Sequence, residues 1–106
     1  MSLKDKQKQV DDWVKQFEKP YFSPLSILAQ LSEEVGELAR TLNNNYGDRV
    51  KKSQEPNSEI KEEICDILFA LICLANSHNI DLDEAWDSKI GERCKRDNER
   101  YEKKEN

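Results

Sequence analysis

The sequence contains a single histidine, His78, and no Glu-x-x-His pair. Helical di-iron proteins bind their metals through such pairs, so the sequence argues against that class of site. It also lacks a plausible nucleophile with a histidine partner, which argues against covalent catalysis by the protein. We therefore expect His78, at the end of a predicted helix, to have a structural role.

Glycine, proline and cysteine are scarce, with three of each among 106 residues, and no alternating strand pattern is present. This composition favours helices. The cysteines are odd in number, have no CxxC spacing and include two in the most apolar segment. We therefore expect a reduced, cytoplasmic protein with buried thiols. These cysteines are Cys65, Cys73 and Cys94.

Long hydrophobic runs and an excess of positive charge are also missing. The longest apolar run, residues 67–75, is too short to span a bilayer, and the first residues lack the apolar segment of a signal peptide. The net charge of −5 argues against nucleic acid as the main partner. A small phosphorylated ligand remains possible, because bound cations can reverse the local field. We expect neither a membrane nor a nucleic-acid partner.

Helical periodicity occurs in four segments and predicts an all-α, four-helix bundle forming a single domain over residues 1–106. A serine before a proline and an aspartate three residues before a glutamate are typical of helix starts. A charged end, about 98–106, is expected to fray. The segments are about 3–18, from Ser23-Pro24 to a turn at 43–47, about 57–77, and from Asp81 to about Asn98.

The first segment has one apolar stripe, because its large side chains recur at i, i+3, i+4 and i+7. They are Val10, Trp13, Val14 and Phe17. We expect these residues to pack in the core. The alternative is that Trp13 and Phe17 form a pocket in which a nucleobase stacks.

The third segment is apolar nearly all round. From Ile64 to Ala75, eleven of twelve residues are apolar, and Asp66 is the exception. Such a helix must be covered on every side. Three short companion helices would hardly suffice, so we expect self-association to complete the core.

Acidic residues gather on two of the predicted helices. Glu33, Glu34 and Glu37 lie within one turn of the second helix, where Gly36 leaves room for close packing or for a ligand. Glu63 and Asp66 share a face of the third helix. In an antiparallel hairpin the two acidic strips meet, and neither strip contains a lysine or arginine.

Buried carboxylates of like charge cost several kcal/mol unless something compensates them. Oxygen ligands suit Mg²⁺, with Mn²⁺ as a substitute, and two metals about 3.5–4 Å apart fit this number of acids. The alternative is a solvated acidic face. Asp66 favours the metal interpretation, because its helix is expected to offer little surface to solvent.

These motifs resemble those of the MazG-like nucleotide pyrophosphohydrolases, in the all-α NTP pyrophosphohydrolase superfamily. The pattern EExxE at residues 33–37 is followed, after 25 residues, by ExxD at residues 63–66. The resemblance implies Mg²⁺-dependent hydrolysis of a nucleoside triphosphate to a monophosphate and pyrophosphate, and assembly into homodimers or homotetramers. It implies Glu34, Glu37, Glu63 and Asp66 as metal ligands and Glu33 as the residue that positions or activates water.

The last helix departs from the family pattern. Relatives often carry Lys-x-x-x-Arg there to contact phosphates, whereas Glu92 occupies the lysine position before Arg96. Lys89 and Arg93 form a shifted pair, so we keep Lys89, Arg93 and Arg96 as candidate phosphate ligands. Two other functions stay open, namely a non-catalytic helical module whose acidic face binds a basic partner, and a related enzyme acting on phosphoribosyl-ATP.

Overall fold

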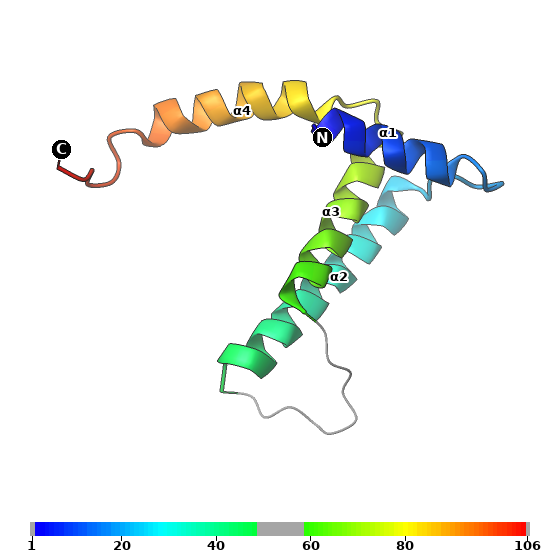
Figure 1. The fold of residues 1–106 in the computed structure, drawn as a ribbon, viewed down its shortest axis with the longest axis horizontal. Coiled ribbons are helices and arrows are strands. Elements are labelled where there is room, and N and C mark those ends of the chain that lie inside the picture. Colours follow the sequence, from blue (N-terminus) through cyan, green and yellow to red (C-terminus); the bar gives the residue numbers. More distant parts are fainter. Residues whose placement is uncertain (1, 49–58, 106) are drawn as a thin grey trace.

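The computed structural model describes residues 2–48 and 59–105, which form four helices (Figure 1). No strand occurs within these ranges, so the predicted all-α class is confirmed. The helices are α1 (Leu3–Val14), α2 (Pro24–Tyr46), α3 (Ile60–Ser77) and α4 (Leu82–Asp97).

The centre of the fold is an antiparallel hairpin of the two longest helices, α2 and α3 (Figure 1). Ser23 caps α2 by accepting a hydrogen bond from the Ser26 amide, and Pro24 occupies the first turn, as predicted. Gly47 follows the last turn of α2, so the helix continues to Tyr46, through most of the predicted turn of residues 43–47. The predicted start of the third helix, at Asn57 and Ser58, lies outside the described residues.

Helix α1 packs against α3 near the open end of the hairpin (Figure 1). A capping box that the sequence analysis did not identify begins this helix: the Ser2 hydroxyl accepts from the Asp5 amide, and the Asp5 carboxylate accepts from the Ser2 amide. Val14 is buried and ends the helix, four residues before the predicted end. Phe17 therefore lies in the turn after α1.

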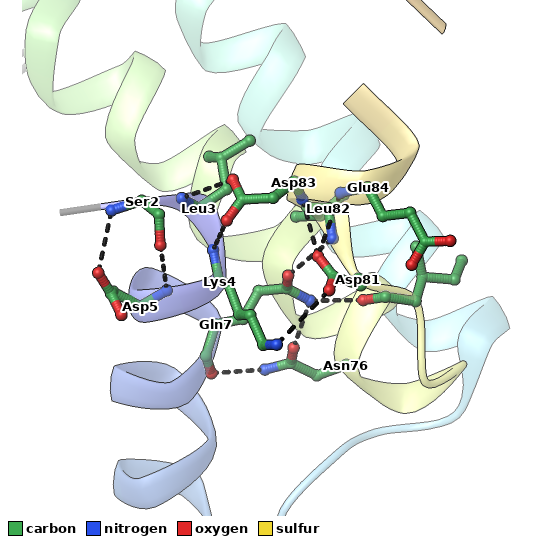
Figure 2. A network of polar contacts seen from close by, with 11 residues as sticks. Ser2, Leu3, Lys4, Asp5, Gln7, Asn76, Asp81, Leu82, Asp83 and Glu84 are labelled. Atoms are coloured by element: carbon green, nitrogen blue, oxygen red, sulfur yellow. Dashed lines mark hydrogen bonds and ion pairs between the residues drawn. The ribbon is translucent and has the colours of Figure 1, made fainter. Parts of the chain in front are cut away.

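Gln7 joins α1 to the junction of α3 and α4, although it is a polar residue in the middle of a helix (Figure 2). Its side chain is buried, and its amide nitrogen donates to Asn76 Oδ1 at 2.9 Å and to the Ile80 carbonyl oxygen at 2.7 Å. Its Oε1 accepts from the Leu82 amide at 2.9 Å. Asn76 Nδ2 in turn donates a hydrogen bond to the Gln7 backbone carbonyl oxygen at 3.0 Å. The buried side-chain amide of Gln7 therefore has hydrogen-bond partners within the fold.

The first turns of α1 and α4 meet and cap one another's backbone (Figure 2). The carboxylate of Asp83 accepts hydrogen bonds from the amides of Leu3 and Lys4, at 3.1 and 3.2 Å. Asp81 caps α4 itself, as predicted, by accepting from the Asp83 and Glu84 amides. A carboxylate at a helix N-terminus also interacts favourably with the helix dipole.

Beyond this junction α4 projects away from the hairpin, and none of its residues is buried (Figure 1). The core of the described chain is consequently small. Its buried apolar residues are Val14, Ile27, Ala70, Ile72 and Ala75. Within residues 2–48 and 59–105, no single helix is long and apolar enough to cross a membrane; α3 and α4 pass that test of length and composition only as a pair, across a bend of 106°.

Six large apolar side chains on the hairpin are between 39% and 51% exposed. Leu28, Val35 and Leu42 repeat every seven residues along α2, and Ile64, Leu68 and Leu71 form a similar stripe on α3. Helical spacing places each stripe on the opposite flank of its helix from Glu37 or Asp66. The six residues form a surface that we call the apolar face.

The three cysteines are free, but they are not all buried, which corrects the prediction. Cys65 and Cys94 are exposed, and Cys73 is half-buried with its thiol pKa raised by burial. Helices α3 and α4 have uncovered flanks in a single chain, and this explains the exposure. His78 follows α3, where its Nδ1 hydrogen-bonds to the Leu74 carbonyl oxygen at 3.0 Å, a structural position.

Candidate metal centre and nucleotide cavity

Carboxylates from both helices of the hairpin converge at its middle. Oxygen atoms of Glu34, Glu37 and Glu63 lie within 4.8 Å of one another. Glu34 and Glu37 are three residues apart on α2, so they occupy one flank of that helix, and Glu63 faces them from the first turns of α3. Three of the four predicted metal ligands are therefore brought together.

Two residues of the cluster each have a buried carboxylate oxygen with no hydrogen-bond partner among the described residues, namely Glu34 Oε2 and Glu63 Oε2. Glu63 is only 6% exposed. The positive end of the α3 dipole offsets only part of the cost of burying its charge. Orphaned oxygens on converging carboxylates match the donor set of a hard divalent cation, so these residues fit Mg²⁺ or Mn²⁺.

The pKa of Glu34 also reflects the burial of this site and its concentration of negative charge. Loss of hydration raises the pKa of its carboxyl above the ordinary value of 4.5, and repulsion by the other acids, Glu37, Asp66, Glu63 and Glu33, adds to the effect. The dominant cause is burial, and the neighbouring charges reinforce it. A cation bound among these groups would remove both penalties.

Asp66 differs from the expectation based on its sequence context. Its side chain is exposed, because among the described residues α2 and α1 supply most of the packing on α3, and the flank that carries Asp66 stays open. It is not in the group of three whose oxygens converge, although its charge acts on Glu34. Glu33 is exposed too, one helical turn before Glu37. The ligand role of Asp66 and the water-positioning role of Glu33 stay predictions.

Arg40 is a neighbour of the site that the sequence analysis missed. It lines an open hollow of about 330 Å³ together with Glu33, Gly36 and Glu37. A cation therefore lies beside the acidic strip of α2, next to Glu37. The signal was present in the sequence, because Arg40 follows Glu33, Gly36 and Glu37 at helical spacings of seven, four and three.

Trp13 and Phe17 lie at the wall of a cavity and not in a closed core. They are 54% and 49% exposed, and their rings meet edge to face with centroids 5.1 Å apart. Trp13 also contacts the ring of Phe69 on α3, at 6.3 Å between centroids. The cavity has a volume of about 460 Å³, and Phe22, Ile27 and Cys73 are among its other lining residues.

This cavity borders the carboxylates. Gln30 lines it and lies one helical turn before Glu34, while Phe69, also in its wall, lies one turn after Asp66. Aromatic walls of this kind suit a flat, partly apolar group such as a nucleobase. The cavity and the acidic cluster thus lie next to one another along the same hairpin.

The candidate phosphate ligands of the last helix do not share this neighbourhood. Lys89, Arg93 and Arg96 lie on α4, which projects away from the hairpin, so within one chain they do not flank the carboxylates (Figure 1). Arg96 in addition donates to Asp97 at 3.0 Å. Their role in phosphate binding stays a prediction.

Comparison with known proteins identifies the family. The MazG nucleotide pyrophosphohydrolase domain matches residues 22–100, which include α2, α3 and α4. A curated relative, the protein YpjD of Bacillus subtilis strain 168, is 47% identical over 104 residues, covering 98% of this chain and 94% of the relative.

Two solved structures share the fold. The crystal structure of YpjD from Bacillus subtilis has a TM-score of 0.77 and 48% identity, covering 87% of this chain and 94% of that chain. The crystal structure of the Bacillus-conserved MazG protein, described as a nucleotide pyrophosphohydrolase, has a TM-score of 0.75 and 44% identity, covering 87% and 88%. The chain therefore belongs to the MazG nucleotide pyrophosphohydrolase family and is a hydrolase acting on acid anhydrides.

Proposed function

We propose that this protein hydrolyses nucleoside triphosphates, including deoxy or non-standard ones, to a nucleoside monophosphate and pyrophosphate with the help of Mg²⁺. The observation that carries the proposal is the convergence of Glu34, Glu37 and Glu63 with two buried, unpartnered oxygens. Buried carboxylates without partners lower the stability of the fold, and such unfavourable groups are expected at functional sites. Removal of non-standard nucleotides from the cytoplasmic pool is the role we propose.

Glu34, Glu37 and Glu63 would hold the metal, with Asp66 as the fourth ligand. When bound there, Mg²⁺ lowers the pKa of a coordinated water and offsets negative charge on the phosphates. Glu33 is exposed beside Glu37, on the open side of the cluster, which suits a residue that orients the attacking water. The protein's own contribution is to position groups, because phosphoryl transfer needs no covalent bond to the enzyme.

The aromatic cavity would hold the base. Trp13 and Phe17 supply the stacking surface, and Gln30 at the cavity edge supplies an amide that can donate and accept hydrogen bonds. The α-phosphate of a nucleotide bound in this way would lie over Glu34 and Glu37, one to two turns further along α2. The cavity thus supports a nucleotide substrate.

The assembly we propose is a homodimer or homotetramer built on the apolar face. Six half-exposed large apolar side chains on neighbouring helices form an extended hydrophobic surface of the kind that marks an interface. A second hairpin packed on this face would cover the exposed flank of α3 that lies opposite Asp66. The phosphate-binding role of Lys89, Arg93 and Arg96 is proposed for this assembled state, since α4 projects away from its own hairpin.

A panel of common and modified nucleoside triphosphates, together with phosphoribosyl-ATP, tests the proposal by pyrophosphate release with and without Mg²⁺. We expect turnover that depends on Mg²⁺ and is abolished in Glu37→Ala and Asp66→Ala, with helicity unchanged by circular dichroism. Absence of turnover on every compound, with no rise in melting temperature on adding Mg²⁺, would reject the enzyme in favour of a non-catalytic acidic module. Exclusive turnover of phosphoribosyl-ATP would reassign the substrate.

A further inference from the structure

Arg40 is the one cation that the structure places in the hollow with Glu33, Gly36 and Glu37 on the exposed flank of α2. The side chain of Arg40 makes no ion pair or hydrogen bond with any other residue in the ranges 2–48 and 59–105. Helix α1 shows that such pairs do form in this protein, since Lys8 binds Asp12 and Lys15 binds Asp11 at 2.6 Å. The guanidinium of Arg40 is therefore available, although Glu37 lies one turn away.

Gly36 forms the floor of the same hollow. A glycine inside a helix costs about 1 kcal/mol relative to alanine, so its position calls for a physical reason. Close helix packing is not that reason among the described residues, because a Cβ placed on Gly36 would meet nothing within 4 Å. What the missing side chain provides is open space between Glu33, Glu37 and Arg40.

Three features follow one another along α2 in the direction of the chain. Ile27 and Gln30 line the aromatic cavity, Glu34 and Glu37 belong to the acidic cluster, and Arg40 lines the hollow beyond them. From Gln30 to Arg40 the helix rises by about 15 Å, a distance comparable to the length of an extended nucleoside triphosphate. A base in the cavity and an α-phosphate at the cluster would direct the outer phosphates toward the hollow.

We propose that Arg40 and the hollow above Gly36 bind the β- and γ-phosphates of the substrate, and hence the pyrophosphate that leaves. This inference rests on the proposed function and extends it to the leaving group. Once cations neutralise Glu34, Glu37 and Glu63, the negative charges that remain for Arg40 to balance are those of Glu33 and of the polyphosphate. A guanidinium suits this task, because its planar fork donates two parallel hydrogen bonds to a phosphate group.

The test compares wild type with Arg40→Gln, and uses Arg100→Gln as a matched control at an exposed position beyond α4. Inhibition constants are measured for both products in the presence of Mg²⁺, together with KM and kcat for the best substrate. We expect Arg40→Gln to weaken inhibition by pyrophosphate and to raise KM about tenfold, the effect of one lost charge-assisted contact. Inhibition by the nucleoside monophosphate should be unchanged, whereas a purely structural defect would weaken both products.

Gly36→Leu provides a second test that keeps every charge and adds a good helix former. Filling the hollow should weaken the binding of Mg²⁺-pyrophosphate at least as much as the loss of Arg40, with helicity retained or increased. Arg40→Lys, which keeps the charge and loses the fork, should fall between wild type and Arg40→Gln.

Direct calorimetry of Mg²⁺-pyrophosphate binding separates this inference from the proposed function. Equal affinity in wild type and Arg40→Gln, or no affinity in wild type, would overturn the assignment of Arg40 even if nucleotides are hydrolysed. A tenfold loss in Arg40→Gln, in a protein that hydrolyses no nucleotide, would support the pyrophosphate site and reject the proposed reaction.

Discussion

The hydroxyl of Tyr21 donates a hydrogen bond to Asp11 Oδ1 at 2.6 Å, joining the segment before α2 to the side of α1. The same hydroxyl accepts from Asn76 Nδ2 on α3 at 3.0 Å, so one oxygen links three parts of the fold. The ring of Tyr21 also lines the aromatic cavity. This residue therefore couples the polar junction of the helices to the wall of the proposed base site.

Replacing Tyr21 with phenylalanine is expected to lower the free energy of unfolding by about 2 kcal/mol. The ring stays, but Asp11 loses one charged hydrogen bond and Asn76 Nδ2 loses one of its two acceptors. Urea denaturation monitored by circular dichroism measures the change. An unaltered midpoint would show that the bond contributes nothing to stability.

The contribution of Tyr21 should also depend on alkaline pH. Burial, with help from the bond to Asp11, raises the pKa of Tyr21 from 10.0 to about 12. The folded state thus favours the protonated phenol, and this stabilisation is complete below pH 10 and is lost as the pH rises toward 12. The difference in stability between wild type and Tyr21→Phe should shrink across that interval, and a constant difference would contradict the assignment.

Glu34→Gln is expected to stabilise the metal-free protein at neutral pH by about 1 kcal/mol, because it removes the charge from a crowded, partly buried position. The sign follows from the raised pKa of Glu34: the fold favours the protonated carboxyl, so wild type loses stability relative to the variant as the pH rises above 4.5. Thermal melts at several pH values in a chelating buffer measure this difference.

Magnesium should reverse that order. A ligand that binds only the folded state raises its stability according to concentration and affinity, and wild type alone retains the full set of carboxylates. Millimolar Mg²⁺ is therefore expected to raise the melting temperature of wild type and not that of Glu34→Gln. Equal gains in both proteins would mean that the cation binds elsewhere.

Trp13 offers a spectroscopic test of the base site. The sequence contains two tryptophans, so Trp86→Phe leaves Trp13 as the sole indole and Trp13→Phe leaves Trp86 on α4. Nucleotide binding with Mg²⁺ should quench the fluorescence of the protein that retains Trp13, and should leave the other spectrum unchanged. Trp13→Ala should raise KM about tenfold through lost stacking.

The apolar face predicts an oligomer that a single charge can disrupt. Leu68→Glu places a carboxylate in this face and should shift the protein toward monomers in sedimentation velocity at micromolar concentration. Ala29→Glu adds the same charge at an exposed position of α2 outside the face and serves as the control. Identical sedimentation of wild type and Leu68→Glu would exclude this face as the interface.

Much of the fold was predictable, because its helices carry their own start signals. Ser23-Pro24 and Asp81 cap α2 and α4 where the sequence predicts, and Glu34, Glu37 and Glu63 of the two acidic motifs converge as expected, whereas Asp66 lies outside their group. The caps, and the shared helix face of the acids within each motif, depend on residues a few positions apart in the chain. Start signals and helical periodicity are sufficient to predict them.

The features that escaped prediction depend on contacts between distant residues. Gln7 lies on the apolar side of α1, where the sequence pattern gives no reason for a polar residue. The reason is its hydrogen bonds to Asn76, Ile80 and Leu82, which are distant in the chain. Asp83 caps α1 from the other end of the sequence, which no local pattern reveals. The exposure of Asp66 follows from the number of helices that cover α3, a tertiary property.

The shared junction of α1 and α4 has a consequence for how the protein is made. The first turn of α1 has left the ribosome long before Leu82 and Asp83 are translated. Asp83 is the hydrogen-bond partner of the Leu3 and Lys4 amides, and Leu82 is the partner of the Gln7 side chain. The hairpin of α2 and α3 needs only its own sequence, whereas α1 waits for almost the whole chain. Biogenesis should therefore proceed from the middle of the chain outward, with both ends locking together in a single late step.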